Sequence, residues 1–229
     1  MSDIKQLSES LVQPILTIGR KVAIVGSSAV LLKKEYGDII DSYDTVIRFN
    51  RAPVVGYENF VGSKTDIRVV NAHVFTNTSC EGDERFKTAK LTQPKNFIKE
   101  LENTTILHVG TAGAGSVDPD EMGWSDRSTH IHPTSKAFIM NYNGIPISDL
   151  GKAPTVGIKT IKLMILNNLT PHLFGFGLDE SGVSHYWEDR DPVSQCHGYS
   201  DERNKLKHWE KQVQITIFII SRWYWKYRW

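Results

Sequence analysis

The first part of the chain alternates short apolar runs with stretches of helical or polar pattern. The run KVAIVG at 21–26 precedes a stretch in which Val30, Leu31 and Ile39 recur at helical spacing. A second run, YDTVIRF at 43–49, follows it. A strand, a helix and a strand in this order predict a βαβ unit, whose crossover connection makes the two strands parallel.

The pattern continues with apolar runs at 66–70 and 104–109, which predict two more strands. The stretch 76–96 between them is polar and predicts a surface excursion. Strands that alternate with helices in this way indicate an α/β fold with a Rossmann-like, mostly parallel, doubly wound sheet. In such sheets, ligands bind where strand ends meet helix starts.

A second helix signal opens at Pro154, with Thr155 as its N-cap and Asn167 and Asn168 as its stop. The run HLFGFG at 172–177 then predicts a strand of the same sheet. The apolar face of this helix is expected to comprise Ile158, Ile161, Leu163, Ile165 and Leu166.

Length and charge narrow the class of protein. A chain of 229 residues that is 40% hydrophobic can bury one substantial core, so we expect a single domain. The 27 basic and 26 acidic residues leave a net charge of +1, which argues against a nucleic-acid binder. We expect a lead segment at 1–20, a catalytic domain at 21–212 and a C-terminal segment at 213–229.

The expected location is cytoplasmic, with the protein soluble or peripheral to a membrane. The sequence shows neither an apolar run of signal-peptide quality nor the roughly 18 apolar residues of a spanning helix. Cys80 and Cys196 permit at most one disulfide. The apolar run 215–220 and the following SRWYWKYRW suit a membrane interface, although a last strand or helix that packs on the core is the favoured interpretation.

Two turns of small residues are candidates for phosphate binding, because such turns free backbone N–H groups beside a helix N-terminus. The first comprises Gly26, Ser27 and Ser28, and the second follows Pro154 with Thr155, Val156 and Gly157. Small residues at strand ends are also ordinary turn residues, so neither turn is decisive alone.

The segment 178–199 is rich in His, Asp, Tyr and Trp, which is typical of an active-site loop. It carries His185, Tyr186 and His197, with Glu202 just beyond. Two imidazoles can divide the work of a displacement, one as base and one as donor to a leaving phosphate. A pair of solvated loop histidines is the alternative.

Other motifs are incomplete. Gly62-Ser63-Lys64-Thr65 resembles the end of a P-loop, but Ser63 interrupts the Gly-Lys succession, so we reject an NTPase. The glycines of 110–115 lack the order of a dinucleotide fingerprint. The Asp-x-Asp triplets at 118–120 and 189–191 could hold a divalent cation beside a nucleotide diphosphate, although such triplets arise often by chance.

Taken together, the segment from Val22 to Arg68 resembles the long sialylmotif of the animal-type sialyltransferase family, and three shorter motifs follow in the family's order. The stretch 154–177 is similar to the short motif, and His185-Tyr186-Trp187-Glu188 is similar to the third. His197 with Glu202 five residues on is similar to the last. No motif can be placed at about 72–150.

The resemblance implies a GT-A-like variant of the doubly wound fold and an inverting transfer of sialic acid from CMP-sialic acid to a glycan hydroxyl, often of galactose. It implies no metal and no cofactor beyond the CMP-sugar co-substrate. It assigns the base to His197, phosphate contacts to His185 and Tyr186, and a place in the catalytic group to Glu202. The implied donor-binding residues are Gly26, Ser27, Ser28, Asn50, Thr155, Val156, Gly157, Gly175 and Phe176.

Departures from the family keep alternatives open. Ser27 stands where the family's turn has Asn, and Ala29 stands where it has Gly, which leaves the donor's identity open. Another CMP-activated acid such as Kdo, or a nonenzymatic scaffold that binds glycan or nucleotide, are the competing interpretations. A metal-dependent UDP-sugar transferase using Asp189 and Asp191 is a third. The acceptor is expected to be an oligosaccharide or glycolipid.

Overall fold

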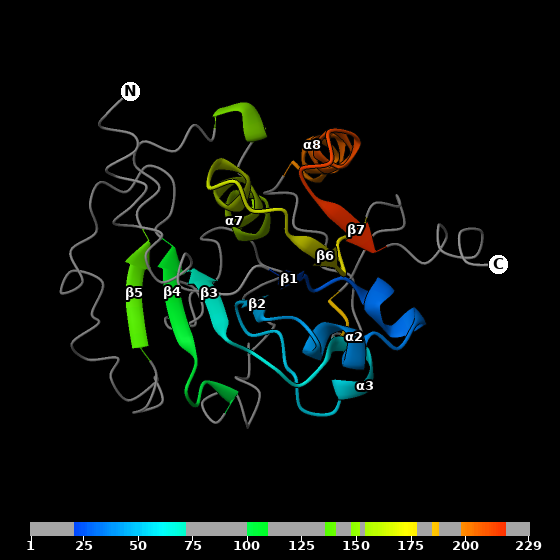
Figure 1. Ribbon diagram of the computed structural model, residues 1–229, viewed down its shortest axis with the longest axis vertical. Coiled ribbons are helices and arrows are strands. Elements are labelled where there is room, and N and C mark those ends of the chain that lie inside the picture. Colours follow the sequence, from blue (N-terminus) through cyan, green and yellow to red (C-terminus); the bar gives the residue numbers. More distant parts are fainter. Residues whose placement is uncertain are drawn as a thin grey trace, which may run out of the picture.

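The computed structural model describes residues 21–71, 100–109, 136–140, 148–151, 154–177, 185–187 and 198–218. Within these ranges, seven parallel strands form one sheet in the order β5-β4-β3-β2-β1-β6-β7 (Figure 1). The strands are β1 (Val22–Val25), β2 (Thr45–Phe49), β3 (Ile67–Asn71), β4 (Thr105–Val109), β5 (Lys136–Met140), β6 (His172–Phe174) and β7 (Thr216–Phe218). The predicted α/β fold with a doubly wound parallel sheet is therefore confirmed.

The order of the strands places a topological switch point beside β1. From β1 the chain adds β2, β3, β4 and β5 successively on one side, and then β6 and β7 on the other. In open α/β sheets, ligands bind in the crevice at the carboxyl ends of the strands where the order reverses. The carboxyl ends of β1 and β6 are therefore the expected ligand position.

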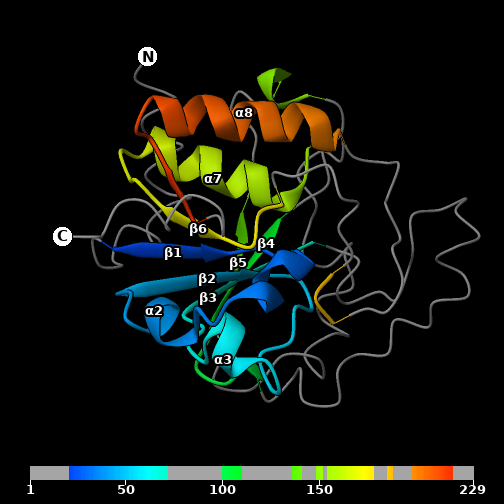
Figure 2. The ribbon, with the colours of Figure 1, turned by 90° about the vertical axis from the view of Figure 1, so that its right-hand side faces the viewer.

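Helices cover both faces of the sheet (Figure 2). On one face lie α7 (Val156–Leu166) and, outside it, α8 (Tyr199–Lys211), with the short 3-10 helix η3 (Ser148–Leu150) beside α8. The other face carries η1 (Ala29–Lys33), α2 (Gly37–Asp41) and α3 (Glu58–Val61). Alternate strand residues serve the two layers: Val22 and Ile24 pack with α7 and α8, whereas Ala23 and Val25 pack with η1 and α2.

The predicted helix between β1 and β2 is instead two short pieces, η1 and α2. Ser28 caps η1 by accepting a hydrogen bond from the Val30 N–H, and Lys34 then leaves helical geometry with φ −153°. At Gly37 the chain passes so close to α3 that a Cβ would lie 2.2 Å from the Glu58 carbonyl oxygen. Packing between α2 and α3 therefore sets this path, and hydrophobic spacing does not reveal it.

The predicted helix after Pro154 is confirmed as α7, with Thr155 Oγ1 accepting from the Ile158 N–H and Asn167 at its C-cap. Its buried face differs from the prediction, because Leu166 is 50% exposed while Lys159 and Lys162 are buried. The two lysines are buried because α8 covers the outer side of α7 (Figure 2), while the sheet covers its inner side.

Two elements, β5 and α8, were not predicted, and β7 was predicted only as one of the alternatives for the run 215–220. Strand β5 lies in the stretch 72–150, where no motif was placed. Helix α8 begins at Tyr199, where the expected active-site loop 178–199 ends. Strand β7 pairs with β6, which supports the core-packed interpretation for the start of the C-terminal segment. The basic and aromatic residues after 218 and the polar stretch 76–96 lie outside the described residues, and the proposed domain boundaries stay predictions.

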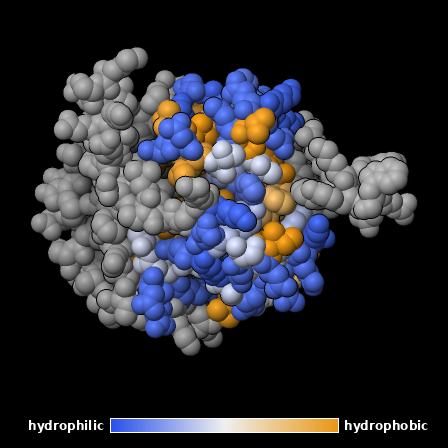
Figure 3. All heavy atoms as spheres, in the orientation of Figure 1, coloured by the Kyte–Doolittle hydropathy of each residue, from blue (hydrophilic) through white to orange (hydrophobic). Residues whose placement is uncertain are grey.

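Polar residues dominate the described surface on the face that Figure 3 shows, with apolar residues in small groups among them. Large exposed apolar side chains include Leu32, Val55 and Val213. In the ranges given above, none of the helices combines the length and the hydropathy that crossing a membrane requires.

Candidate active site

The turn after β1 is joined to the end of β6 by backbone hydrogen bonds. The Gly26 N–H donates to the Phe174 carbonyl at 2.7 Å, and the Ser28 N–H donates to the Gly175 carbonyl at 3.1 Å. The contact is so close that a Cβ on Gly26 would lie 2.5 Å from the Gly175 oxygen. The sequence-predicted residues Gly26, Ser27, Ser28 and Gly175 therefore meet at the switch point.

The segment 185–187 crosses the same place. Ser28 and His185 form an antiparallel bridge, and the Tyr186 N–H donates to the Ser27 carbonyl at 3.0 Å. Along this short bridge and turn, Tyr186 is buried, whereas His185 is exposed and Trp187 is half-buried. The fold thus brings an imidazole beside the first predicted phosphate turn.

Tyr186 is an anchor between two loops in this structure. Its hydroxyl donates to the Pro53 carbonyl, and its ring meets Tyr57 edge to face at 5.0 Å. Burial raises the pKa of the Tyr186 phenol well above its ordinary value. The hydroxyl is therefore committed to backbone here, and the phosphate contact assigned to it stays a prediction.

Two arginines that the sequence motifs did not single out lie near Tyr186 in the interior of the sheet. Arg48 and Arg68 are register partners in β2 and β3, with 1% and 0% of their surface exposed. Burial, followed by the charge of Arg68, lowers the pKa of Arg48 to about 10. Arg68 pairs with Glu100 at 3.6 Å, and that carboxylate is itself 7% exposed.

These buried charges hold the two loops that flank α3. Arg48 donates to the carbonyls of Val61, Gly62 and Lys64 and to the Thr65 hydroxyl. Arg68 donates to the carbonyls of Asn50 and Ala52, and Glu100 accepts from the N–H groups of Val54 and Val55. Arginines inside the apolar runs TVIRF and DIRVV could have signalled this, because buried arginine requires compensating partners.

Asn50 stands at the carboxyl end of β2, the strand next to β1. Its φ of 44° lies in the left-handed region, which Asn tolerates better than most residues. Its side-chain Oδ1 accepts from the Asn71 N–H at 3.1 Å, which links the ends of β2 and β3. Asn50 is therefore at the carboxyl edge of the sheet, part of its amide already has a structural partner, and its donor contact stays a prediction.

The N-terminus of α7 is held by Glu202 from the first turn of α8. Glu202 Oε1 accepts from the Thr155 N–H at 2.6 Å, and Oε2 accepts from the Thr155 hydroxyl at 2.8 Å. The carboxylate is 8% exposed. Lys159 lies near it: burial lowers the pKa of this lysine, and the charge of Glu202 partly opposes that shift. Glu202 thus acts as a positioning residue here, and its membership of the catalytic group stays a prediction.

This contact also changes the expectation for the second phosphate turn. Because the Thr155 N–H and hydroxyl both donate to Glu202, neither is directed to a ligand in this arrangement. Val156 and Gly157 occupy the first turn of the helix, where N–H groups have no intrahelical acceptor. A Cβ on Gly157 would lie 3.3 Å from the Phe176 ring, so Gly157 and Phe176 adjoin.

Replacing Glu202 by Ala should destabilise the protein by about 1–3 kcal/mol, because a charged, buried acceptor of two hydrogen bonds is lost. Urea denaturation measures this change. Glu35→Ala, at an exposed glutamate, is the matched control and should change the free energy of unfolding by less than about 0.5 kcal/mol. Equal effects of the two substitutions would contradict the positioning role.

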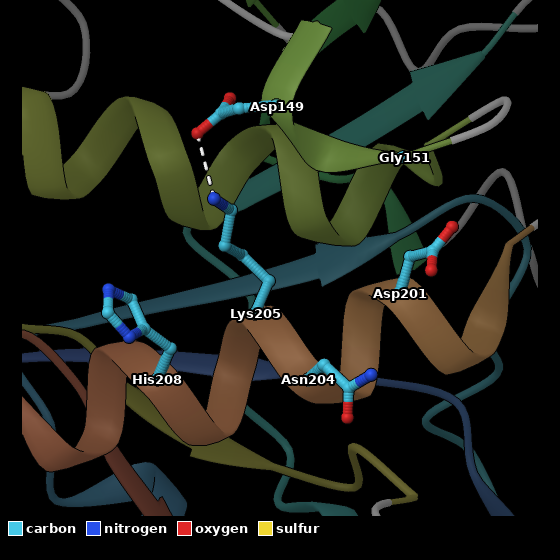
Figure 4. Close-up of a pocket in the computed structure, with 6 residues that line it drawn as sticks. All are labelled: Asp149, Gly151, Asp201, Asn204, Lys205 and His208. Atoms are coloured by element: carbon cyan, nitrogen blue, oxygen red, sulfur yellow. Dashed lines mark ion pairs between the residues drawn. The ribbon is translucent and has the colours of Figure 1, made fainter.

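A separate pocket lies along α8 and η3 (Figure 4), with a volume of about 580 Å³. Its lining residues are Asp149, Gly151, Asp201, Asn204, Lys205 and His208. Lys205 reaches from α8 to pair with Asp149 at 2.9 Å. None of the predicted donor-binding residues lines this pocket, and we place the candidate site at the strand ends because the sheet order and the convergence of loops point there.

Several predicted residues lie outside the described ranges. They include the proposed base His197 and the acidic residues Glu188, Asp189 and Asp191. Within the described part of the chain, no cluster of three His, Cys, Asp or Glu side chains has the spacing of a metal site.

A doubly wound parallel sheet whose small-residue turns meet at a switch point defines a class of α/β proteins in which ligands bind at the carboxyl ends of the strands. Within that class the family is shown by sequence. The profile of glycosyltransferase family 29 (sialyltransferase) matches residues 4–213, and the chain belongs to this family.

Curated relatives agree with this assignment. A mouse protein named CMP-N-acetylneuraminate-beta-galactosamide-alpha-2,3-sialyltransferase 1 is 32% identical over 171 residues, which are 74% of this chain and 49% of the relative. A human protein named beta-galactoside alpha-2,6-sialyltransferase 2 is 48% identical over 60 residues, which are 26% of this chain and 11% of the relative. The chain spans about half the length of the first of these.

A solved structure supports the fold. A mammalian sialyltransferase in complex with Gal-beta-1-3GalNAc-ortho-nitrophenol superposes with a TM-score of 0.62, covering 95% of this chain and 78% of that one at 22% identity. At this identity the likeness establishes the shared fold.

Proposed function

We propose that the protein transfers sialic acid from CMP-sialic acid to a glycan hydroxyl, with galactose as the acceptor sugar. The observation that carries the proposal is the convergence of the Gly26–Ser28 turn, Gly175 and His185 at the switch point of a family 29 chain. The names of the relatives favour this donor and a galactose-containing acceptor.

In the proposed step, the acceptor oxygen attacks the anomeric carbon of the sugar as the bond from that carbon to the CMP phosphate oxygen breaks. The bonding electron pair leaves with the phosphate, and the acceptor proton passes to His197. Attack opposite to the leaving group inverts the anomeric centre. A positioned base of this kind contributes about 10²- to 10⁴-fold to the rate.

The described residues support this step by their positions. His185 is exposed beside Ser28, where an imidazole can donate a hydrogen bond to the departing phosphate. The first-turn N–H groups of Val156 and Gly157 offer further donors. Because CMP carries a single phosphate, donors of this kind can stabilise it, and we propose that the reaction needs no metal.

The assay that tests the function supplies CMP-sialic acid and a galactose-terminated acceptor array in the presence of EDTA. Formation of a sialylated product, with its linkage determined by NMR, is expected. If the protein turned over CMP-Kdo but not CMP-sialic acid, CMP-Kdo would be the donor in place of the one proposed. Loss of activity in EDTA would overturn the metal-free mechanism. Absence of both transfer and hydrolysis of the donor would indicate a scaffold that binds without catalysis.

Replacing Asn50 by Gly should weaken the binding of CMP, because the amide at the end of β2 is lost. Calorimetry or a thermal shift with CMP measures the change. Asn50→Ala is the matched comparison: it loses the same amide and also places an alanine at a φ of 44°, which costs about 1–2 kcal/mol of stability. Unaltered CMP affinity in Asn50→Gly would remove Asn50 from the donor site.

A further inference from the structure

Trp187 makes an aromatic contact whose geometry bears on His185. The indole and imidazole rings are stacked, with centroids 4.5 Å apart and an angle of 6° between their planes. The two residues lie two positions apart, at the bridge and in the turn that follows it, and the turn lets their rings meet face to face. The stack is thus part of the segment that bridges to Ser28.

Trp187 is itself held by further contacts. Its ring meets Tyr186 edge to face at 4.8 Å, and it packs against the core cluster below α2 and α3. Tyr186 in turn is fixed to Pro53 through its hydroxyl and to Ser27 through its N–H. The exposed imidazole therefore stacks on a ring that is itself fixed by the Tyr186 anchor.

We propose that Trp187 is a positioning residue that holds the His185 imidazole in one orientation at the switch point. The inference rests on the proposed function and deepens it, because the stack would order the His185 imidazole before the donor phosphate binds. A pre-ordered donor needs no reorganisation during the reaction. If Trp187 only filled space in the core, its replacement would have the same effect on activity whether or not His185 was present.

Two substitutions separate the stack from simple packing. Trp187→Phe keeps an aromatic face and should retain most of the activity. Trp187→Leu keeps apolar volume without a ring, and should lower kcat by about two- to tenfold, the range expected for a lost aromatic pair. The KM for CMP-sialic acid should change less than kcat, because the lost ordering concerns the leaving phosphate in the transition state.

A double-mutant cycle shows whether Trp187 acts through His185. If it does, adding Trp187→Leu to His185→Gln costs no further activity, because the group it positions is already gone. Proton NMR supplies an independent signature: the ring current of the indole should displace the Hε1 resonance of His185, which is identified by its absence in His185→Gln. Trp187→Leu should abolish that displacement, and Trp187→Phe should keep part of it.

Fully additive losses, or wild-type kcat in Trp187→Leu, would overturn the positioning role while leaving the transferase function intact. A His185→Gln variant as active as wild type, or a wild-type chain that transfers nothing, would remove the proposed role of His185 and this inference with it. If Trp187→Leu does not fold, Trp187→Met takes its place in the same cycle and is judged by the same outcomes.

Discussion

His197→Ala is expected to lose about 10²- to 10⁴-fold in kcat, because no positioned base then takes the proton of the acceptor hydroxyl. The affinity for CMP should be unchanged, since the predicted donor contacts lie at the ends of β1, β2 and β6 and in the first turn of α7. Single-turnover kinetics with CMP-sialic acid, together with CMP binding by calorimetry, measure both quantities.

The matched control is His208→Ala. This histidine is exposed on α8 and lines the separate pocket of Figure 4, so its loss should leave kcat near that of wild type. If His197→Ala turned over at the wild-type rate, the base would have to be another group. If it lost CMP binding as well, its role would be in the donor site.

The second large effect concerns stability. Glu100→Ala should lower the free energy of unfolding by about 3–5 kcal/mol, because it leaves the buried charge of Arg68 without its carboxylate. It also removes the acceptor for the N–H groups of Val54 and Val55. Urea denaturation measures the change, and Glu100→Gln, which keeps an acceptor oxygen without the charge, should lie between Ala and wild type.

Lys205→Ala is the matched comparison for Glu100→Ala. It breaks the more exposed ion pair with Asp149, whose side chain is 48% exposed, and such pairs contribute about 0–1 kcal/mol. Comparable losses of unfolding free energy in the two variants would mean that the burial of Arg68 does not increase the contribution of its carboxylate partner to stability. The loop 50–57 would then owe its shape to packing instead of charge.

The buried arginines show how charge in a core can serve a site. Arg48 and Arg68 stabilise irregular backbone by donating to carbonyls of the loops on either side of α3. Tyr186 attaches the His185 segment to one of those loops. The arrangement thus connects the sheet interior, the loop after β2 and the imidazole at the switch point, and each link can be broken separately by mutation.

Much of the fold followed from local pattern. The run 21–26 and the HLF of β6 were predicted as strands because β-branched and apolar residues fill buried parallel strands, and Thr155 was predicted as a cap because its hydroxyl suits a helix start. The order of four motifs indicated the family, which the profile match confirmed. The strands, the cap and each single motif depend on residues near one another in the chain, and the order of the motifs can be read directly along it.

The failures have a common cause. The single helix predicted after β1 became two because Gly37 meets the carbonyl of Glu58, and Lys159 and Lys162 are buried because α8 covers the outer side of α7. The pairing of Arg68 with Glu100 and the hydrogen bonds from Thr155 to Glu202 join distant positions. No spacing rule within one element encodes contacts of this kind.

The sequence by itself determined the family, the parallel sheet and the edge of the sheet where the site should lie. Periodicity is local to each element, and the order of the motifs can be read directly along the chain. Only the tertiary structure decided what the named side chains do there: Glu202 and Tyr186 hold backbone groups, and Trp187 stacks on His185. The physical reason is that a side chain's hydrogen bonds and ring contacts depend on which distant groups folding brings within reach.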